Sequence, residues 1–405
     1  MILETHFSRL QYIGSMNKMR MNVLRVAVLI GVLAGTTGLQ TNAQVGGAAV
    51  VFLKIEPDSR SAGMGNAGVA LADNASAMFW NPAGLAFQTG TEASITHSNW
   101  LPEFNAGLFY EYLVAKHHVP NWGTFGVHLT YLFLGEHEGR DELNIPTGTF
   151  RSYDLAIGAS YGVKVTDRFG LGTSARFIYS NLAPKQVVGG QATKAGVAAA
   201  FDISGLYKFD TIDLGTTKAS PSIGFNLSNM GPKIQYSDSE QADPIPTNLR
   251  FGGAVTFDID DYNAVSFALD LNKDLIHSTI DTARGVSEAD PFYKAIFSSW
   301  SAIDVCTSTL ERCEEDPSEL ETLSVFDQMT IGTGMEYWYN QLFAIRAGYF
   351  YENPYNGNRK FMTLGAGIRY NIIGVDFSYI YALEEDSPLA NTMRFSLLLN
   401  FGQGS

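Results

Sequence analysis

The sequence predicts an all-β protein, a 14-stranded antiparallel transmembrane β-barrel, and three observations carry that prediction. Apolar side chains alternate with small or polar ones through most of the chain, most clearly in residues 153–165, 169–179 and 393–401, and such alternation forms one face of a strand. Most of these segments are longer than strands of soluble proteins. Tight turns also alternate with long loops, as in bacterial outer-membrane barrels. A soluble β-sandwich with its apolar rows turned inward is the alternative.

Residues 1–43 read as a secretory signal peptide. Basic residues precede an apolar run at 26–39, and the small residue Ala43 follows it, which is the order of parts in such a peptide. The run is shorter than the roughly 20 residues that a transmembrane helix needs. We expect cleavage near Ala43, with Met16 as a possible true start.

Residues 44–90 precede the first alternating segment, and we expect them to form a compact hatch, or plug, that enters the barrel. Small residues and turn residues dominate this stretch. The structural motif that we assign to it consists of Gly63, Gly65, Gly68, Trp80, Asn81 and Pro82. The three glycines also match a dinucleotide fingerprint, but no βαβ unit and no suitably spaced acidic residue follow them. We therefore expect no nucleotide there.

Residues 91–401 carry the barrel strands. The fourteen expected strands lie near 91–97, 107–118, 122–134, 151–165, 168–181, 194–209, 219–229, 247–257, 262–273, 326–340, 341–352, 361–371, 372–384 and 391–401. Strands of about 9–11 residues cross a bilayer when they are tilted. Aromatic residues near strand ends, such as Phe169, Tyr179 and Tyr339, fit interfacial girdles.

The small and polar row of these strands would then face the lumen. It holds residues of both charges, namely Asp154, Lys164, Arg176, Asp202, Arg250, Asp270, Glu336, Arg346, Arg369, Asp376 and Arg394. Because the signs are mixed, we expect ion pairs inside a narrow barrel rather than a selective ion pathway.

The longest connection, 274–325, is the strongest candidate for partner binding, since loops of that length are usually functional or disordered. It contains both cysteines of the chain, Cys306 and Cys313, and an exported protein meets an oxidising compartment. We expect a disulfide between them, with two free thiols as the alternative. The candidate partner-binding residues are Glu314, Glu315, Asp316 and Glu319. Solvation of a mobile loop is an equal alternative for these acidic residues.

The residues favour no enzyme and no nucleic-acid binder. The formal net charge is −14, so the protein repels phosphates. The chain has no nucleophile elbow, which is a G-x-S-x-G turn between a strand and a helix, and no H-E-x-x-H motif of a zinc site. Its two cysteines form no Cys-x-x-Cys pair. We therefore predict no catalytic residues, no metal site and no cofactor.

The hatch motif, with its Asn-Pro-Ala-Gly at 81–84, resembles the FadL-like outer-membrane barrels. Longer strings resemble the PorV and PorQ proteins of the type IX secretion system, and they lie at 245–253, 258–263, 269–273, 336–339 and 347–353. PorV proteins often have Lys-Tyr after Asn-Pro-Ala, where this chain has Gly84 and Leu85. The resemblance therefore leaves PorV and a close paralogue both open.

This resemblance implies a FadL-like barrel and a non-enzymatic role in the outer membrane. A PorV-like protein associates with the type IX translocon barrel and binds exported cargo by its folded C-terminal signal domain. It then delivers the cargo to a cell-surface attachment complex. The partners implied are thus these proteins and outer-membrane lipid. The second function that stays open is a FadL-like transporter of hydrophobic small molecules.

Overall fold

The computed structural model describes residues 47–140, 145–183, 187–188, 191–237, 242–281, 286–306, 320–385 and 387–402. The chain divides into two units, 1–41 and 42–405, and all of the described residues belong to the second. The expected signal peptide with its cleavage site near Ala43, and the alternative start at Met16, lie outside the described residues.

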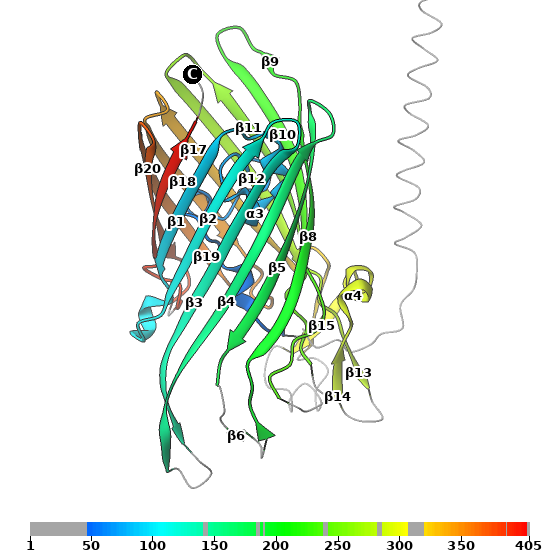
Figure 1. The fold of residues 1–405 in the computed structure, drawn as a ribbon. Helices are drawn as coiled ribbons and strands as arrows, with labels where there is room; N and C mark the ends of the chain where they lie inside the picture. The colour runs from blue at the N-terminus through cyan, green and yellow to red at the C-terminus, as the bar shows by residue number, and fades with distance from the viewer. Residues whose placement is uncertain are drawn as a thin grey trace, which may run out of the picture. The chain divides into compact units, whose positions relative to one another are not determined.

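Fourteen long antiparallel strands form a closed barrel, as predicted (Figure 1). These strands are β1 (Thr91–Asn99), β2 (Phe109–Val119), β3 (Gly123–Arg140), β4 (Pro146–Lys164), β5 (Phe169–Asn181), β8 (Gly196–Lys208), β10 (Lys218–Met230), β11 (Asn248–Asp258), β12 (Asn263–Asp274), β17 (Met329–Tyr339), β18 (Phe343–Tyr351), β19 (Lys360–Tyr370), β20 (Ile373–Ala382) and β21 (Met393–Phe401). Each strand pairs with its neighbours in sequence order, and β1 pairs with β21 from Thr91 opposite Phe401 to close the ring.

The remaining elements lie in the loops and before β1. The short strands are β6 (Val187–Val188), β7 (Gln191–Ala192), β9 (Ile212–Asp213), β13 (Ser278–Asp281), β14 (Val286–Ala289), β15 (Ile303–Cys306) and β16 (Leu320–Leu323). The helices are η1 (Val51–Lys54), α2 (Ser59–Ala62), α3 (Ala77–Trp80), η2 (Pro82–Phe87), η3 (Pro102–Phe104) and α4 (Phe292–Ser298). Among the residues that the structure describes, no helix is both long and apolar enough to span a membrane.

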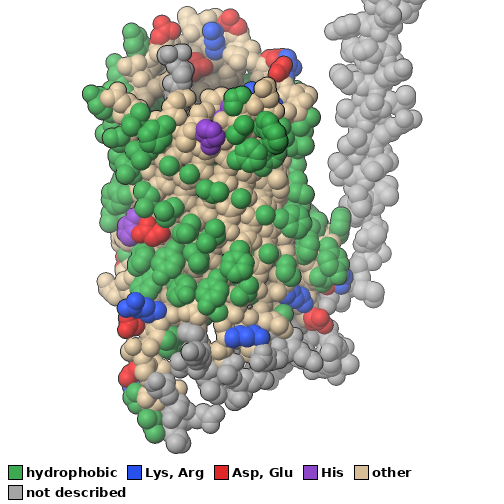
Figure 2. Space-filling model, viewed as in Figure 1, with side chains coloured by type: hydrophobic (Ala, Val, Ile, Leu, Met, Phe, Trp, Pro, Cys, Tyr) green, Lys and Arg blue, Asp and Glu red, His purple; other side chains and the backbone are tan. Residues whose placement is uncertain are grey.

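The apolar rows point outward. Along β4, Leu155, Ile157 and Ala159 face the outside, whereas Asp154 and Ser160 are buried inside the barrel. Green apolar side chains cover the visible wall in a broad band, and charged side chains gather above and below it (Figure 2). Because the apolar surface is on the outside and the polar surface inside, the wall suits a bilayer. The sandwich alternative is wrong.

Aromatic rings line both edges of this apolar band. Near the long-loop end the ring of Tyr153 lies 5.7 Å from that of Tyr131 and 6.1 Å from that of Tyr179. Near the short-turn end, Phe125 and Tyr161 lie 4.8 Å apart. Two such rows are typical of residues at the two membrane surfaces.

One segment differs from the prediction. Residues 135–150 were expected to form a loop, but most of them lengthen β3 and β4 beyond the wall (Figure 1). The pairing shifts between Phe133 and Glu136, and Gly135 has a φ of 101°. Beyond this bulge the hairpin is polar, so the apolar alternation that predicts the other strands is absent there.

Candidate functional site: the hatch inside the barrel

The segment 47–90, called the hatch from here on, runs through the lumen from the long-loop end to the short-turn end. At the long-loop end the backbone N–H of Ala49 donates to the carbonyl of Pro244 over 3.0 Å, and Lys54 pairs with Asp274 at the end of β12. At the other end, the N–H of His118 donates to the carbonyl of Gly90 over 3.0 Å. The hatch therefore spans the whole barrel before it enters β1.

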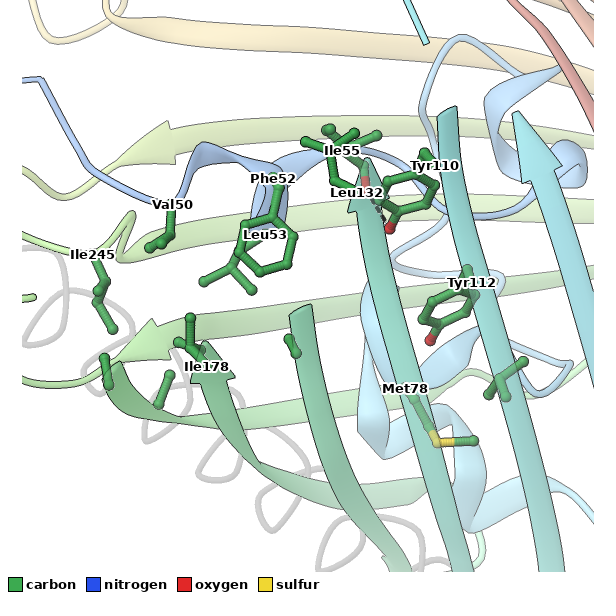
Figure 3. Close-up of a cluster of buried hydrophobic side chains, with 14 of the residues drawn as sticks. Val50, Phe52, Leu53, Ile55, Met78, Tyr110, Tyr112, Leu132, Ile178 and Ile245 are labelled. Atoms are coloured by element: carbon green, nitrogen blue, oxygen red, sulfur yellow. Dashed lines mark hydrogen bonds between the residues drawn. The ribbon is translucent and has the colours of Figure 1, made fainter. Parts of the chain in front are cut away.

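The first part of the hatch is held by apolar packing. Phe52, Leu53 and Ile55 are buried and face wall and loop residues, among them Ile178 and Ile245 (Figure 3). The Tyr110 hydroxyl also donates to the carbonyl of Ile55 over 3.4 Å (Figure 3). This apolar cluster fills the lumen near the long loops.

The middle of the hatch is held by charge, through Arg60. Its guanidinium donates to both carboxylate oxygens of Glu336 over 2.8 and 2.6 Å and also binds Asp73. The carboxylates of Asp73 and Glu336 balance the charge of the Arg60 guanidinium inside the barrel. Arg60 thus joins two parts of the hatch to β17.

The same carboxylate belongs to a longer chain of alternating charges across the wall. Arg346 donates to Glu336 over 2.6 Å and to Asp376 over 2.9 Å, and Arg369 binds Asp376 over 2.7 Å. On the opposite side of the barrel Arg176 pairs with Asp202. The expected ion pairing of lumenal residues is therefore confirmed at these positions.

The first two glycines of the hatch motif allow close contact with the wall. Gly65 has a φ of 65°, and a Cβ there would lie 2.4 Å from the carbonyl oxygen of Thr333. A Cβ on Gly63 would lie 3.2 Å from the Cα of Gly365. The N–H of Gly65 donates to the Thr363 hydroxyl over 2.8 Å. The backbone of the hatch thus lies directly against that of the wall, where only glycine fits.

The third glycine begins a backbone site for a carboxylate. The N–H groups of Gly68 and Val69 donate to one oxygen of Asp270 over 2.7 and 2.9 Å. Successive backbone N–H groups in such a turn form an anion-binding concavity. Since the protein's own Asp270 occupies it, this geometry does not favour a phosphate there.

Trp80 and Asn81 connect distant parts of the hatch. The Trp80 indole N–H donates to Asp58 over 2.5 Å, and a Cβ on Gly68 would lie 2.7 Å from the indole ring. The Asn81 amide donates to the carbonyls of Val69 and Gly205 over 2.9 and 3.1 Å. The backbone N–H of Ser61 also donates to the carboxylate of Asp58 over 3.0 Å.

Asn81 and Pro82 also begin the last helix of the hatch. The side-chain oxygen of Asn81 accepts the N–H of Ala83 over 3.1 Å, and Pro82 is the first residue of η2. This is a common start for a helix, because proline needs no N–H partner there. All six motif residues therefore lie inside the barrel and hold the hatch together or against the wall.

Sequence reasoning missed the glycines of the wall that face the hatch. A Cβ on Gly348 of β18 would lie 2.0 Å from the nitrogen of Gly65, and one on Gly334 of β17 would lie 2.3 Å from the carbonyl oxygen of Met64. The only available signal was the presence of glycine in the lumen-facing row of otherwise regular strands. Their role depends on which segment lies opposite.

The candidate disulfide and acidic residues of the longest loop are not tested. Cys313, Glu314, Glu315, Asp316 and Glu319 lie outside the described residues, and of Cys306 the structure describes only its place in β15. These assignments stay predictions.

The hatch occupies the lumen and contacts the wall at both ends and in the middle. Among the residues that the structure describes, no three His, Cys, Asp or Glu side chains are grouped so that they could hold a metal ion. The charged groups described above bind one another across the hatch and the wall. The arrangement can hold a plug in place, and it leaves the loops and the outer wall for contacts with other molecules.

Comparison with solved structures finds two toluene transporters and a FadL homologue among the similar proteins. The structure is similar to the Ralstonia pickettii toluene transporter TbuX at 13% identity, with 86% of this chain and 99% of that chain covered and a TM-score of 0.43. It is similar to the P. putida toluene transporter TodX at 13% identity, with 86% and 100% covered and a TM-score of 0.49. A Pseudomonas aeruginosa FadL homologue matches at 12% identity, with 85% and 98% covered and a TM-score of 0.39. No curated protein sequence matches the chain.

A protein-family model gives the sharper result. The model of the type IX secretion system protein PorV matches residues 39–281, which is more than half of the chain. The match spans the hatch and the first nine barrel strands. The chain belongs to the PorV family and is an outer-membrane β-barrel component of the type IX secretion system.

Proposed function

We propose that this PorV-family protein binds the folded C-terminal signal domain of exported cargo at the type IX translocon barrel and carries that cargo to a cell-surface attachment complex. It catalyses no reaction in this proposal and needs no cofactor. Beyond the family assignment, the observation that supports the proposal is the hatch inside the lumen. With the hatch in place, the loops and the outer wall are the surfaces that can bind another protein.

The hatch supports a docking role over transport through the barrel. A lumenal route for a hydrophobic molecule would need the hatch to leave, and Arg60 is bound to two carboxylates while Gly68 and Val69 hold Asp270. Opening would break these contacts, a cost that docking at the loops does not carry. A FadL-like transporter is therefore the less favoured function.

The long-loop end supports protein binding directly. Exposed aromatic side chains are present in three separate loops there, Phe104 before β2, Phe326 before β17 and Tyr355 before β19. Exposed aromatic residues beside polar loop residues are typical of interaction surfaces. They offer a folded signal domain a surface that lies outside the membrane.

A locked hatch distinguishes docking from transport. The hydroxyl oxygens of Ser59 in α2 and Ser396 in β21 lie 2.9 Å apart and are buried, so the double variant Ser59→Cys/Ser396→Cys is designed to crosslink hatch and wall. We expect the crosslinked protein to restore surface display of cargo in a deletion strain to the level of the unaltered protein. The two single variants and the reduced double variant are the controls.

Loss of display in the oxidised double variant, with recovery on reduction, would contradict docking and require movement of the hatch. The binding partner is tested separately, by affinity purification of the unaltered protein from outer membranes. We expect secreted proteins that share a C-terminal domain to be recovered with the translocon barrel. Recovery of lipid alone would favour the transporter.

A further inference from the structure

The helix α4 lies outside the barrel wall rather than over its mouth. The ring of Phe292, the first residue of α4, lies 6.1 Å from the ring of Phe201 at an interplanar angle of 89°. Phe201 belongs to the outward row of β8. Figures 1 and 2 show α4 beside β8, where its apolar side chains protrude at the lower edge of the apolar band. The helix therefore continues the lipid-facing surface.

Large apolar side chains lie on both faces of α4. One face, with Phe292, Ala295 and Ile296, is turned toward the protein. The other face is exposed, with Tyr293 at 65%, Phe297 at 78% and Trp300 just after the helix at 41%. In water such a face would be unfavourable. At a membrane surface, tyrosine and tryptophan are enriched and a short aromatic helix binds well.

A hollow of about 700 Å³ lies on the outer wall beside α4, with Phe292 as the residue of α4 that lines it. Small side chains on the outward rows create it, at Ala159, Ala175 and Ala199. Larger apolar side chains border it, among them Phe177 and Phe292. A hollow in a lipid-facing wall with a mostly apolar lining fits a hydrocarbon chain.

Polar contacts on the protein side hold α4 in this position. The carboxylate of Asp290, directly before the helix, accepts hydrogen bonds from His277 over 2.8 Å, Lys294 over 2.6 Å and Ser298 over 2.8 Å. The amide of Gln328, next to β17, donates to the carbonyl of Ser301 over 3.0 Å. The exposed aromatic face is thus presented by a fixed helix.

We propose that α4 is seated in the outer leaflet of the outer membrane and that acyl chains of an outer-leaflet lipid fill the hollow on the wall beside α4. Continuity with the lipid-facing wall selects lipid as the occupant. The one charged side chain of α4, Lys294, is paired with Asp290, and a paired charge is easier to place in an apolar layer than a free one. The longest loop is then tied to the membrane beside the barrel.

Spin labels test where α4 lies. In a Cys306→Ser/Cys313→Ser background, a label is placed at Phe297→Cys and, separately, at Tyr293→Cys, and the protein is reconstituted in phosphatidylcholine nanodiscs. Ile157→Cys on the outer wall is the membrane control, and Glu138→Cys on the β3–β4 hairpin is the water control. We expect both α4 labels to match Ile157, with several-fold more collisions with oxygen than with a water-soluble nickel chelate.

Collision with both reagents, as at Glu138, would place α4 in water and overturn the proposal. If the α4 labels collide with neither oxygen nor the nickel chelate in nanodiscs, α4 lies against the protein itself and the proposal is overturned. If they are shielded from both reagents only in native outer membranes, α4 contacts a partner barrel instead of lipid, which also overturns it.

The hollow is tested by Ala199→Trp, which fills it. We expect fewer co-extracted lipids by native mass spectrometry than for Ala366→Trp, an outward position of β19 away from the hollow; equal lipid retention would overturn that part.

Discussion

At the scale of single residues, the hatch depends on a few contacts that only these side chains can make. Arg60 reaches Glu336 on the wall and Asp73 within the hatch, and Asp270 accepts two backbone N–H groups. Each of these groups is a charge held inside the barrel. Removal of one partner therefore costs more than the contact itself, since the other is left without compensation.

Arg60→Gln is expected to release the middle of the hatch. The change leaves the buried Glu336 with Arg346 alone, and loss of one partner of a buried pair costs about 3–5 kcal/mol. Faster amide hydrogen exchange in residues 58–73 would reveal the release. Arg168→Gln, which removes an exposed pair with Asp210 at a rim turn, is the matched control and should leave exchange unchanged. Equal exchange in the two variants would refute the role of Arg60.

Gly348→Ala tests the contact between the wall and the hatch. The added methyl group would lie 2.0 Å from the nitrogen of Gly65, so either the hatch or β18 has to move. We expect a lower yield of folded barrel in outer membranes. Gly253→Ala adds the same group on β11, where no atom lies within 4 Å, and should fold normally. A normal yield for both variants would mean that the hatch does not lie against β18.

At the scale of elements, the apolar rows explain which strands sequence reasoning found. A strand in the wall has one row against lipid, so it must alternate, and all fourteen such strands lie close to their predicted positions. The extension of β3 and β4 has no lipid face. Its residues Glu136, His137 and Glu138 follow one another without an apolar row, and its strands are held by backbone pairing and by polar and ring contacts such as Arg151 with Glu136.

The connection that contains α4 is expected to loosen in acid. Burial alone would raise the pKa of Asp290, but hydrogen bonds from Lys294, Ser298 and His277 outweigh it and the pKa is lowered. The carboxylate of an unfolded loop titrates near pH 3.9. The stabilisation is therefore complete above about pH 4 and is lost as the pH falls through the lower, folded value.

Limited proteolysis of residues 275–300 between pH 3 and pH 7 would measure this effect. We expect cleavage to increase only below about pH 4, while Asp290→Asn should be cleaved readily at every pH in that range. Asp213→Asn, in the exposed short strand β9, is the control. A pH profile for Asp290→Asn that matches the unaltered protein would show that this carboxylate does not hold the loop.

At the scale of the whole molecule, the closed ring of strands is the dominant feature. Every barrel strand has hydrogen-bonded neighbours on both sides, with β1 and β21 completing the circle. A closed barrel has no free edge, so it resists unfolding in detergent. We expect the purified protein to migrate faster on a gel without heating than after boiling. Identical migration of the two samples would argue against a stable closed barrel.

The alternating pattern settled the number and order of the strands, because a lipid-facing wall imposes a period of two on each of them. Strand length and loop alternation also predicted correctly that the apolar row faces outward. The pattern could not reveal what lies opposite each lumen-facing residue. Segments far apart in sequence make these contacts, namely Gly348 with Gly65, Glu336 with Arg60 and Phe292 with Phe201. Such contacts depend on how the barrel closes, which no local period records.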